Sequence, residues 1–512
     1  MPETRKAETK QLFFRCMLFT FIWGIIAHGY CYFNLIFSHD SLLVYQNDVL
    51  WQISIGRFLH PVYFLLRGHI YAPALVGVLS LTFIGTAVFL VCTLLNARGL
   101  KTVILYSGIM TVNASVSLLN ATYLMDADMY ALSLVFAVTS VYVCRNRRCW
   151  YVSSLIMVLS LGLYQAYFQV AVFLFMILAL IDILRKKDTK QVVFEGLRAI
   201  ASLLIGLILY YIVLSVLLKT MHIELSGEYN GLTEVGKFGS VMDIAKRIIR
   251  TYVFTAEFFV KPGAIFGGRF MVLINCVIIA LTAFFIISLI YRRKIRGGAL
   301  FVLIALAAVM PFGMNVIYFI ADGAHNLMEY SLYLAYILAF EIFRLWIETR
   351  VPAQPELSLR TAGIAVLPCA LAVFLFCSTV YSNQVYLKKD LEYRATQQTM
   401  NRVIYRMEDT DGYELGVTPV AVIGTFEYSP LRVTREGFPA VGIGLKSEFA
   451  VTYPDTFSNY FRYIMDYPIN LIKADACEAL AETEEIKQMP LFPAKGSCRM
   501  IDGVMVVKLG EI

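Results

Sequence analysis

Acids, histidines and arginines gather in a polar stretch, residues 38–70, that follows the first long apolar segment of the chain. Its acids are Asp40 and Asp48, with His39 beside the first and Arg57 after the second. Charged side chains beside a bilayer are costly, and they are kept where they have a use. A positioned carboxylate can accept the proton of a sugar hydroxyl, which is otherwise a poor nucleophile. We therefore expect the stretch, called loop one below, to carry a catalytic base that activates a hydroxyl group.

Each of the two acids also has a simpler explanation. Asp40 can cap a helix that begins at Ser41, or can end the apolar segment in water. If residues 44–59 are helical, Asp48 lies on an apolar face with Trp51, where an acid requires a partner or a purpose. A loop at this position would remove that requirement. Both acids stay candidates for the base.

Arginines on the same side of the membrane are candidates for binding phosphate. A guanidinium group presents a fork of donors that matches phosphate oxygens. We expect Arg57, Arg269 and His325 to bind the donor phosphate. The alternative for Arg57 is that it reaches lipid headgroups, and for Arg67 this alternative is favoured.

Further polar residues stand between apolar segments and are predicted to bind the substrates with loop one. The predicted substrate-binding residues are His39, Asp126, Asp128, Tyr164, Gln165, Asp322 and Glu329. Asp126 and Asp128 can instead belong to the N-cap of the next helix. The spacing of Asp322, His325 and Glu329 puts them on one face of a helix, as a second polar wall of the site or as a solvated helix start. That spacing is a weak signal for a metal, so no metal site is predicted, although a divalent cation is not excluded.

The composition of the whole chain is that of a polytopic membrane protein. It has 512 residues, of which 59% are hydrophobic and 16% charged, and its mean hydropathy is +0.67. A soluble domain cannot hide that much apolar surface. The formal charge of +7 is explained by basic loops at the ends of apolar segments, so no nucleic-acid partner is expected.

Eleven apolar segments are predicted to span the membrane. They cover residues 12–37, 72–95, 102–121, 128–144, 150–164, 166–184, 199–219, 269–291, 299–320, 329–346 and 361–381. Every second loop between them is basic, and basic loops face the cytoplasm. We therefore expect a cytoplasmic N-terminus, an outward loop one and an outward C-terminal region. The first segment is interpreted as an uncleaved anchor because no small-residue cleavage site is obvious.

The chain is predicted to form two domains. Residues 1–381 are expected to form an α-helical transmembrane catalytic domain, and residues 382–512 a small extracytoplasmic α/β or α+β domain. The second domain contains strand-like runs and a polar segment with Val403 and Met407 at helical spacing, but no recognisable catalytic motif. Its expected role is to cover or shape the site.

The cysteines and the glycine motifs do not predict a cofactor. No Cys or His spacing is that of a zinc site, and neither a phosphate-binding loop nor a dinucleotide fingerprint is present. Most of the ten cysteines lie in or beside apolar segments. Cys477 and Cys498 lie in the predicted outer domain, where they can form a disulfide or stay reduced.

The order of these motifs resembles that of the bacterial Gtr-type glucosyltransferases of serotype conversion. The residues that carry the resemblance are His39-Asp40, Asn47-Asp48, Gly56-Arg57-Phe58-Leu59, Arg67-Gly68, Asp126-Ala-Asp128, Leu161-Gly-Leu-Tyr164-Gln165-Ala-Tyr167 and Ile501-Asp-Gly-Val-Met-Val-Val-Lys508. The similarity covers most of the chain and is densest in residues 30–185.

This resemblance implies a GT-C-type glycosyltransferase embedded in the bacterial cytoplasmic membrane, among its lipids. Such enzymes take a sugar, here glucose by analogy, from a polyprenyl phosphate on the outer face. They add it to a surface glycan, such as an O-antigen, a capsule or a wall polymer. The resemblance places the family's loop-one acid on Asp40 or Asp48 and its Tyr-Gln hairpin on Tyr164 and Gln165.

Two other functions would use a lipid-linked substrate. A flippase or transporter usually has internal repeats and polar residues near the bilayer midplane. Here the acids collect at one membrane face and no matching halves are visible, which favours the enzyme. A glycan polymerase, which joins whole repeat units, is not separated from a transferase by sequence patterning.

Overall fold

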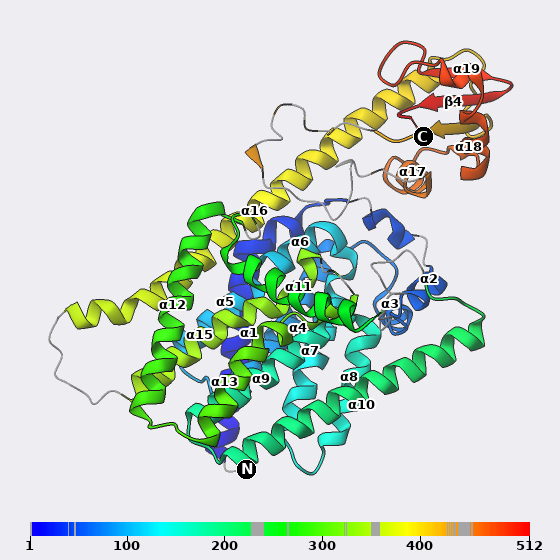
Figure 1. The fold of residues 1–512 in the computed structure, drawn as a ribbon. Helices are drawn as coiled ribbons and strands as arrows, with labels where there is room; N and C mark the ends of the chain where they lie inside the picture. The colour runs from blue at the N-terminus through cyan, green and yellow to red at the C-terminus, as the bar shows by residue number, and fades with distance from the viewer. Residues whose placement is uncertain are drawn as a thin grey trace.

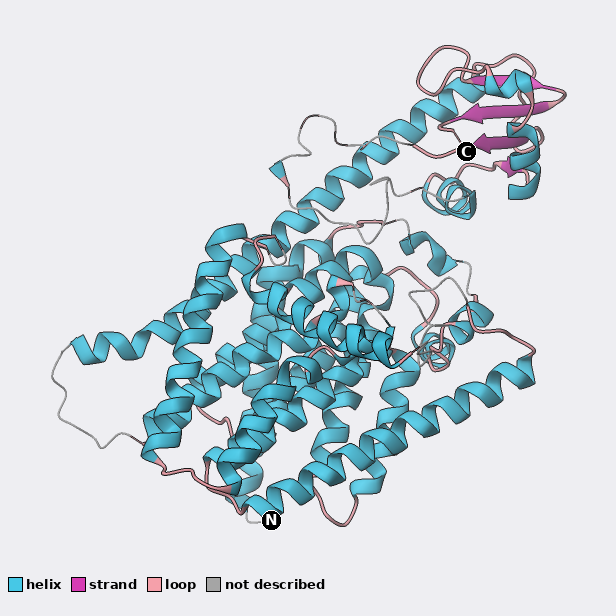
Figure 2. Ribbon diagram, in the orientation of Figure 1, coloured by secondary structure: helices cyan, strands magenta, loops and turns pink. Residues whose placement is uncertain are grey.

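The computed structural model of the protein describes most of the chain and is 75% helical. The described residues are 3–38, 40–45, 48–226, 240–263, 266–321, 323, 325–349, 359–426, 429, 431, 433, 437–438, 451 and 454–511. A large helical bundle makes up the first part, and one long helix leads from it to a small domain that contains the strands (Figure 1; Figure 2). The predicted α-helical membrane protein with a small C-terminal domain is confirmed at this level.

The first part of the chain consists of helices. In chain order they are α1 (Glu3–Phe33), η1 (Asp40–Tyr45), α2 (Val49–Ser54), α3 (His60–Arg67), α4 (Pro73–Leu94), α5 (Leu100–Thr111), α6 (Ala114–Tyr123), η2 (Leu124–Asp126), α7 (Ala127–Cys144), α8 (Trp150–Leu163), η3 (Gln165–Tyr167), α9 (Phe168–Leu184), α10 (Thr189–Met221), α11 (Val241–Val260), α12 (Gly268–Arg292), α13 (Gly298–Gly313), α14 (Val316–Ala321), η5 (Asn326–Met328), α15 (Tyr330–Glu348) and α16 (Leu359–Glu408).

Eight helices among the described residues are long and apolar enough to cross a membrane, with Ala114–Cys144 taken as one helix. Three shorter apolar helices accompany them, α5, α8 and α13. These helices are those of a multi-pass membrane protein. The count of eleven spans and the orientation of the bundle stay predictions.

Two of the predicted spans are interrupted in the structure. Segment 102–121 is divided between α5 and α6, because the Asn113 side chain accepts a hydrogen bond from the Val116 amide at 3.0 Å and starts a new helix there. Segment 299–320 is divided between α13 and α14. The Ile317 amide near the start of α14 donates to Gln169 Oε1 at 3.3 Å, so a side chain of α9 supports this break.

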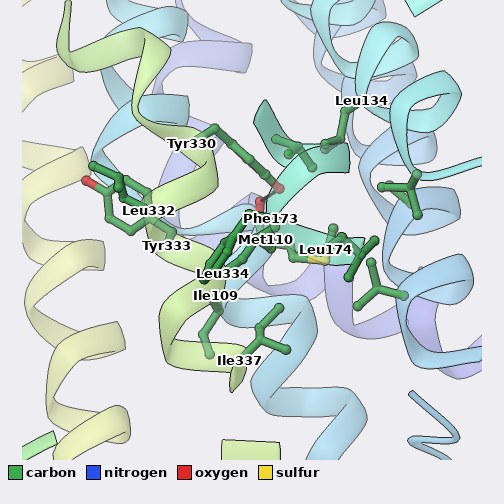
Figure 3. Close-up of a cluster of buried hydrophobic side chains, with 14 of the residues drawn as sticks. Ile109, Met110, Leu134, Phe173, Leu174, Tyr330, Leu332, Tyr333, Leu334 and Ile337 are labelled. Atoms are coloured by element: carbon green, nitrogen blue, oxygen red, sulfur yellow. Dashed lines mark hydrogen bonds between the residues drawn. The ribbon is translucent and has the colours of Figure 1, made fainter. Parts of the chain in front are cut away.

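The centre of the bundle is an apolar core around α15. Figure 3 shows Tyr330, Leu332 and Ile337 of this helix among buried side chains of α5, α7 and α9. Leu332 is wholly buried and Ile337 nearly so. A helix that is apolar all round is expected at such a central place.

The C-terminal domain is a mixed sheet with helices, joined to the bundle by α16. Its elements are β1 (Pro419–Ile423), α17 (Pro454–Asn459), the π-helical turn η7 (Tyr460–Ile464), β2 (Asn470–Leu471), α18 (Ala474–Ala481), α19 (Glu484–Lys487), β3 (Cys498–Ile501) and β4 (Val504–Lys508). The strand order is β2-β1-β4-β3, with β1 parallel to β2 and β4, and β3 antiparallel to β4. The predicted strands and the predicted helix before them are therefore present, although the boundary at residue 382 lies inside α16 and stays a prediction.

The core of this domain takes in Leu42 of loop one and Phe37 just before the loop. Val403 and Met407 of α16, which were predicted to share a helix face, are buried in it together with Phe37 and Leu42. Cys477 packs in a separate cluster of the same domain. All ten cysteines of the chain are free, so the structure contains no Cys477–Cys498 disulfide.

Candidate functional site

Loop one enters the bundle at a tight turn around Gly56. The Gly56 carbonyl accepts a hydrogen bond from the Tyr210 hydroxyl at 3.0 Å, and the Ile55 carbonyl accepts one from Gln165 Nε2 at 2.9 Å. Gly56 has a φ of +81°, and a Cβ at this position would collide with the Tyr210 hydroxyl and the Gln165 amide. Only glycine fits without strain. The turn fixes the backbone of the next residue, Arg57.

Arg57 is buried between two tyrosines. The residue is only 7% exposed, and its Nη1 donates to the Tyr130 hydroxyl at 2.9 Å. Its Cζ lies 5.4 Å from the centroids of both the Tyr130 and the Tyr164 rings. Ring faces attract a cation at this distance. A fixed positive charge therefore stands at the end of the bundle where loop one lies.

A cavity of about 160 Å³ opens beside this arginine. The rest of its wall is largely apolar, and its polar lining residues are Arg57, Tyr123, Tyr130, Tyr164, Gln165, Tyr210 and His325. Apolar walls with a few convergent polar groups are typical of small-molecule sites. The structure thus brings together four residues that were predicted to bind the donor or the acceptor: Arg57, Tyr164, Gln165 and His325.

Asp126 lies behind the cavity wall and connects to it through Tyr130. Its Oδ1 is 3.2 Å from His60 Nε2, and its Oδ2 accepts from the Tyr130 hydroxyl at 3.4 Å. A buried chain of polar groups therefore runs from Arg57 through Tyr130 and Asp126 to His60. Such a network holds the arginine and its tyrosine in one arrangement.

Asp128 is engaged in a second buried network. Its Oδ2 lies 3.3 Å from Arg67 Nε and accepts from the Tyr63 hydroxyl at 2.8 Å. Burial and the neighbouring carboxylate raise the pKa of the Tyr63 hydroxyl, which keeps it protonated as a donor. The Arg67 side chain is only 3% exposed. The favoured interpretation that Arg67 reaches lipid headgroups is therefore wrong, because its charge is paired inside the protein.

The two acids of loop one occupy different environments. Asp48 is exposed, and its Oδ1 accepts from the Trp51 amide at 2.9 Å as the N-cap of α2. Residues 44–59 do not form one helix, so Asp48 lies on no apolar face. Asp40 is half-buried as the first residue of η1. η1 packs against α6, η2 and α17, but Asp40 does not line the cavity.

The segment before α15 does not form the single helix that the spacing of its polar residues suggested. His325 has extended backbone angles and precedes the short η5, so His325 and Glu329 do not share a helix face. Burial lowers the pKa of the His325 imidazole, which makes it a neutral hydrogen-bonding group at the cavity. Glu329 is buried at the start of α15, near Tyr333 and Tyr381, and does not line the cavity.

Three other predicted residues are not placed in the cavity. Arg269 is exposed in the first turn of α12. His39 and Asp322 lie outside the residues that the structure describes.

Sequence reasoning passed over His60, Tyr63, Tyr130 and Tyr210, which support the predicted residues. One available signal was the spacing of Asp126 and Tyr130, which puts them on the same side of a helix. Another was Pro61, because a proline favours the first turn of a helix and thereby places His60 at its start. Tyr210 carries no local signal, because it contacts loop one from the distant helix α10.

The arrangement is suited to binding an oxyanion. Arg57, the neighbouring tyrosine hydroxyls and the neutral His325 offer donors around one cavity. Within the described parts of the chain, no three His, Cys, Asp or Glu side chains are grouped so that they could hold a metal ion.

Comparison with known proteins gives one match. A family model described as Glucosyl transferase GtrII matches residues 29–345. This range contains loop one, both buried networks and every residue that lines the cavity. No curated protein and no solved structure matches the chain.

Proposed function

Because the chain belongs to the glucosyl transferase GtrII family, we propose that it moves glucose from a polyprenyl phosphate to a surface glycan. The family supports glucosyl transfer. The lipid-linked donor, the glycan acceptor, the GT-C mechanism and the outer face of the bacterial cytoplasmic membrane are our proposal.

The observation that supports this proposal most directly is the buried Arg57 at the cavity. Transfer of a sugar from a lipid phosphate leaves negative charge on the phosphate. A preorganised cation in a site with little water stabilises that charge more than an exposed one. The apolar remainder of the wall fits a substrate whose other end is a lipid. Gln165, Tyr164 and the neutral His325 line the same cavity and offer hydrogen bonds to the sugar and the phosphate.

We propose Asp40 as the base that accepts the proton of the acceptor hydroxyl. It is half-buried on η1, which packs against the η2 turn that ends at Asp126. Asp48 is already used as a helix cap and is exposed to solvent. In this mechanism the acceptor oxygen attacks the anomeric carbon, the bond to the phosphate breaks, and the hydroxyl proton passes to the Asp40 carboxylate.

The remaining predicted residues have supporting roles in this proposal. Asp126 orients Tyr130 and, through it, Arg57. Asp128 pairs with Arg67 and fixes the position of its side chain. Glu329 and Arg269 do not line the cavity, and we assign them no direct contact with the reacting groups. His39 and Asp322 remain expected substrate-binding residues.

The experiment is transfer of radiolabelled glucose from polyprenyl-phosphate glucose to surface glycan in membranes that contain the protein. Asp40→Asn should lower the rate by roughly 10²–10⁴-fold, as expected for loss of a general base. Asp48→Asn is the matched control. Asparagine caps a helix as well as aspartate does, so this variant should keep most of the activity.

The outcomes separate the parts of the proposal, provided that immunoblots show equal amounts of each variant in the membrane. If only Asp48→Asn is inactive, the base is Asp48. If both variants transfer glucose normally, neither acid is the base. If the wild type transfers sugar from no polyprenyl phosphate, the proposed function itself fails.

A further inference from the structure

We propose that an apolar groove between α9, α10 and α13 holds the isoprenoid tail of the donor lipid. This inference rests on the proposed function and extends it by assigning the lipid part of the substrate to a second region of the protein.

The groove has a volume of about 460 Å³, which is larger than the cavity at Arg57. Its walls include Val172 and Met176 from α9, Leu203 from α10, and Ala305 and Val309 from α13. Apart from charged residues at one end, its lining is almost wholly apolar. Walls of this kind offer a hydrocarbon dispersion contacts but give a peptide or a sugar no hydrogen-bond partners.

The lining residues of the groove and of the cavity at Arg57 follow one another along two helices. Leu203 lines the groove and Leu207, one turn further along α10, lines the cavity. On α9 the corresponding pair is Val172 and Phe168. Residues four apart lie on the same side of a helix, so both helices carry one continuous surface from the groove to the cavity. A lipid phosphate held at Arg57 would therefore have its tail directed into the groove.

The other end of the groove is charged. Arg145 Nη1 lies 2.9 Å from an Asp182 oxygen and 3.1 Å from a Glu195 oxygen, and all three residues line the groove. Lys187 joins the same two acids at 3.2 and 2.8 Å. Arg198, which is 8% exposed, also lines the groove at this end. These charged side chains make this end unfavourable for hydrocarbon. Between these charged residues and the neighbouring cavity, where Arg57 lies, the groove wall is apolar, which matches a long hydrocarbon tail whose anionic head is at Arg57.

The groove is accessible from the membrane. Phe301 on α13 is 73% exposed and Ile200 on α10 is 55% exposed, and both line the groove. On the inner side α9 and α13 pack closely, because the position of Gly313 leaves no space for a Cβ beside the Met176 sulfur. A lipid tail can thus enter sideways from the bilayer without the helices separating. Figure 1 places α9, α10 and α13 in the half of the bundle away from the C-terminal domain.

Two alanines of α13 provide a matched test. Ala305 lines the groove, whereas Ala307 does not, and both are exposed. In Ala305→Trp the new ring would fill the groove, and in Ala307→Trp it would point elsewhere on the same helix. We would measure the KM of each variant for two donors, one with a full-length polyprenyl tail and one with a tail of two isoprene units.

In the wild type, the long-tail donor should have the lower KM, because its tail is buried in the groove. Ala305→Trp should raise the KM for the long-tail donor by roughly tenfold or more, since several buried methylene groups lose their contacts. It should leave the KM for the short-tail donor unchanged, and Ala307→Trp should change neither value.

Other results would overturn the inference. Equal wild-type KM values for the two donors would show that the tail is not bound. No change in Ala305→Trp, or an equal rise for both donors, would show that the groove holds bulk membrane lipid or only supports helix packing. If the wild type uses neither donor, the proposed function fails as well, and this result is distinct from the others.

Discussion

The two halves of loop one are held by different parts of the molecule. In the first half, Leu42 is buried in the core of the C-terminal domain together with Phe37, which directly precedes the loop. Asn459 Nδ2 on α17 donates to the Leu42 carbonyl at 3.1 Å. In the second half, Gly56 and Arg57 are held by side chains of the helical bundle. Each half of the loop is thus positioned by the part of the molecule that it contacts.

This difference has a consequence for the proposed chemistry. Asp40, the proposed base, lies in the half that the C-terminal domain holds. Arg57, the proposed phosphate ligand, lies in the half that the bundle holds. The distance between base and leaving group therefore depends on how the C-terminal domain packs on the bundle through α16 and α17. We expect damage to the domain to affect turnover and damage to the bundle to affect donor binding.

The largest effect is expected from breaking the buried pair of Arg67 and Asp128 in the bundle half. Arg67→Met leaves the Asp128 carboxylate buried without its cation, which should cost about 3–5 kcal/mol of unfolding free energy. The double variant Arg67→Met/Asp128→Asn should recover much of this loss, because no charge is left unpaired. Denaturant unfolding in detergent micelles measures both values. A loss below about 1 kcal/mol in the single variant, the size of an exposed ion pair, would show that water reaches this site.

A somewhat smaller effect is expected from removing the anchor of the first half. Leu42 is wholly buried, so Leu42→Ala should cost about 2–5 kcal/mol. The matched control is Leu65→Ala, because Leu65 is 80% exposed in the other half and its truncation should be worth less than about 0.5 kcal/mol. Limited proteolysis should show faster cleavage of the C-terminal domain in Leu42→Ala.

The kinetics of these variants test the comparison directly. Leu42→Ala should lower kcat, because Asp40 is displaced, and should leave the donor KM close to that of the wild type. A rise in donor KM with unchanged kcat would contradict the division of labour between the two halves.

Two glycines of loop one separate backbone strain from the loss of a site contact. Gly56 and Gly68 both have positive φ, at +81° and +92°, so an alanine at either should cost about 1–3 kcal/mol. A Cβ at Gly68 would meet nothing within 4 Å, whereas one at Gly56 would displace Tyr210 and Gln165. Gly56→Ala should therefore raise the donor KM, and Gly68→Ala should not. Similar KM values for the two variants would show that the turn at Gly56 does not position Arg57.

Much of the fold could be predicted because its signals are local. Apolar segments are recognised by length and composition. The runs that form β1 and β4 are short, rich in β-branched residues and bounded by turns. The helix break at Asn113 was missed because the same averages over many residues hide a single residue. Asn113 is one N-cap inside an apolar segment.

The partners of the polar residues could not be predicted, because they come from distant parts of the chain. Arg67 has the same appearance in the sequence whether it reaches a headgroup or pairs with Asp128, and only the packing of α3 against the start of α7 decides between them. Likewise, Tyr210 and Gln165 meet Gly56 only after α10 has packed on α8. Hydrophobic patterning places residues at one end of the bundle, but it does not pair them.

The smallest effect is expected at Asp48. From the sequence, this acid could be a helix cap or the catalytic base, and the local pattern does not decide between the two roles. Asp48→Ala removes the side-chain acceptor of the Trp51 amide and should cost about 1 kcal/mol, whereas Asp48→Asn should be nearly neutral because asparagine caps equally well. Because α2 lies on the surface, neither change should lower the rate of transfer by more than about twofold, which corresponds to well under 1 kcal/mol. Transfer rates and unfolding free energies of both variants distinguish a cap from a catalytic base. A large fall in rate for Asp48→Asn, at unchanged stability, would mean that Asp48 is the catalytic base. The base would then lie outside the part of loop one that the C-terminal domain holds.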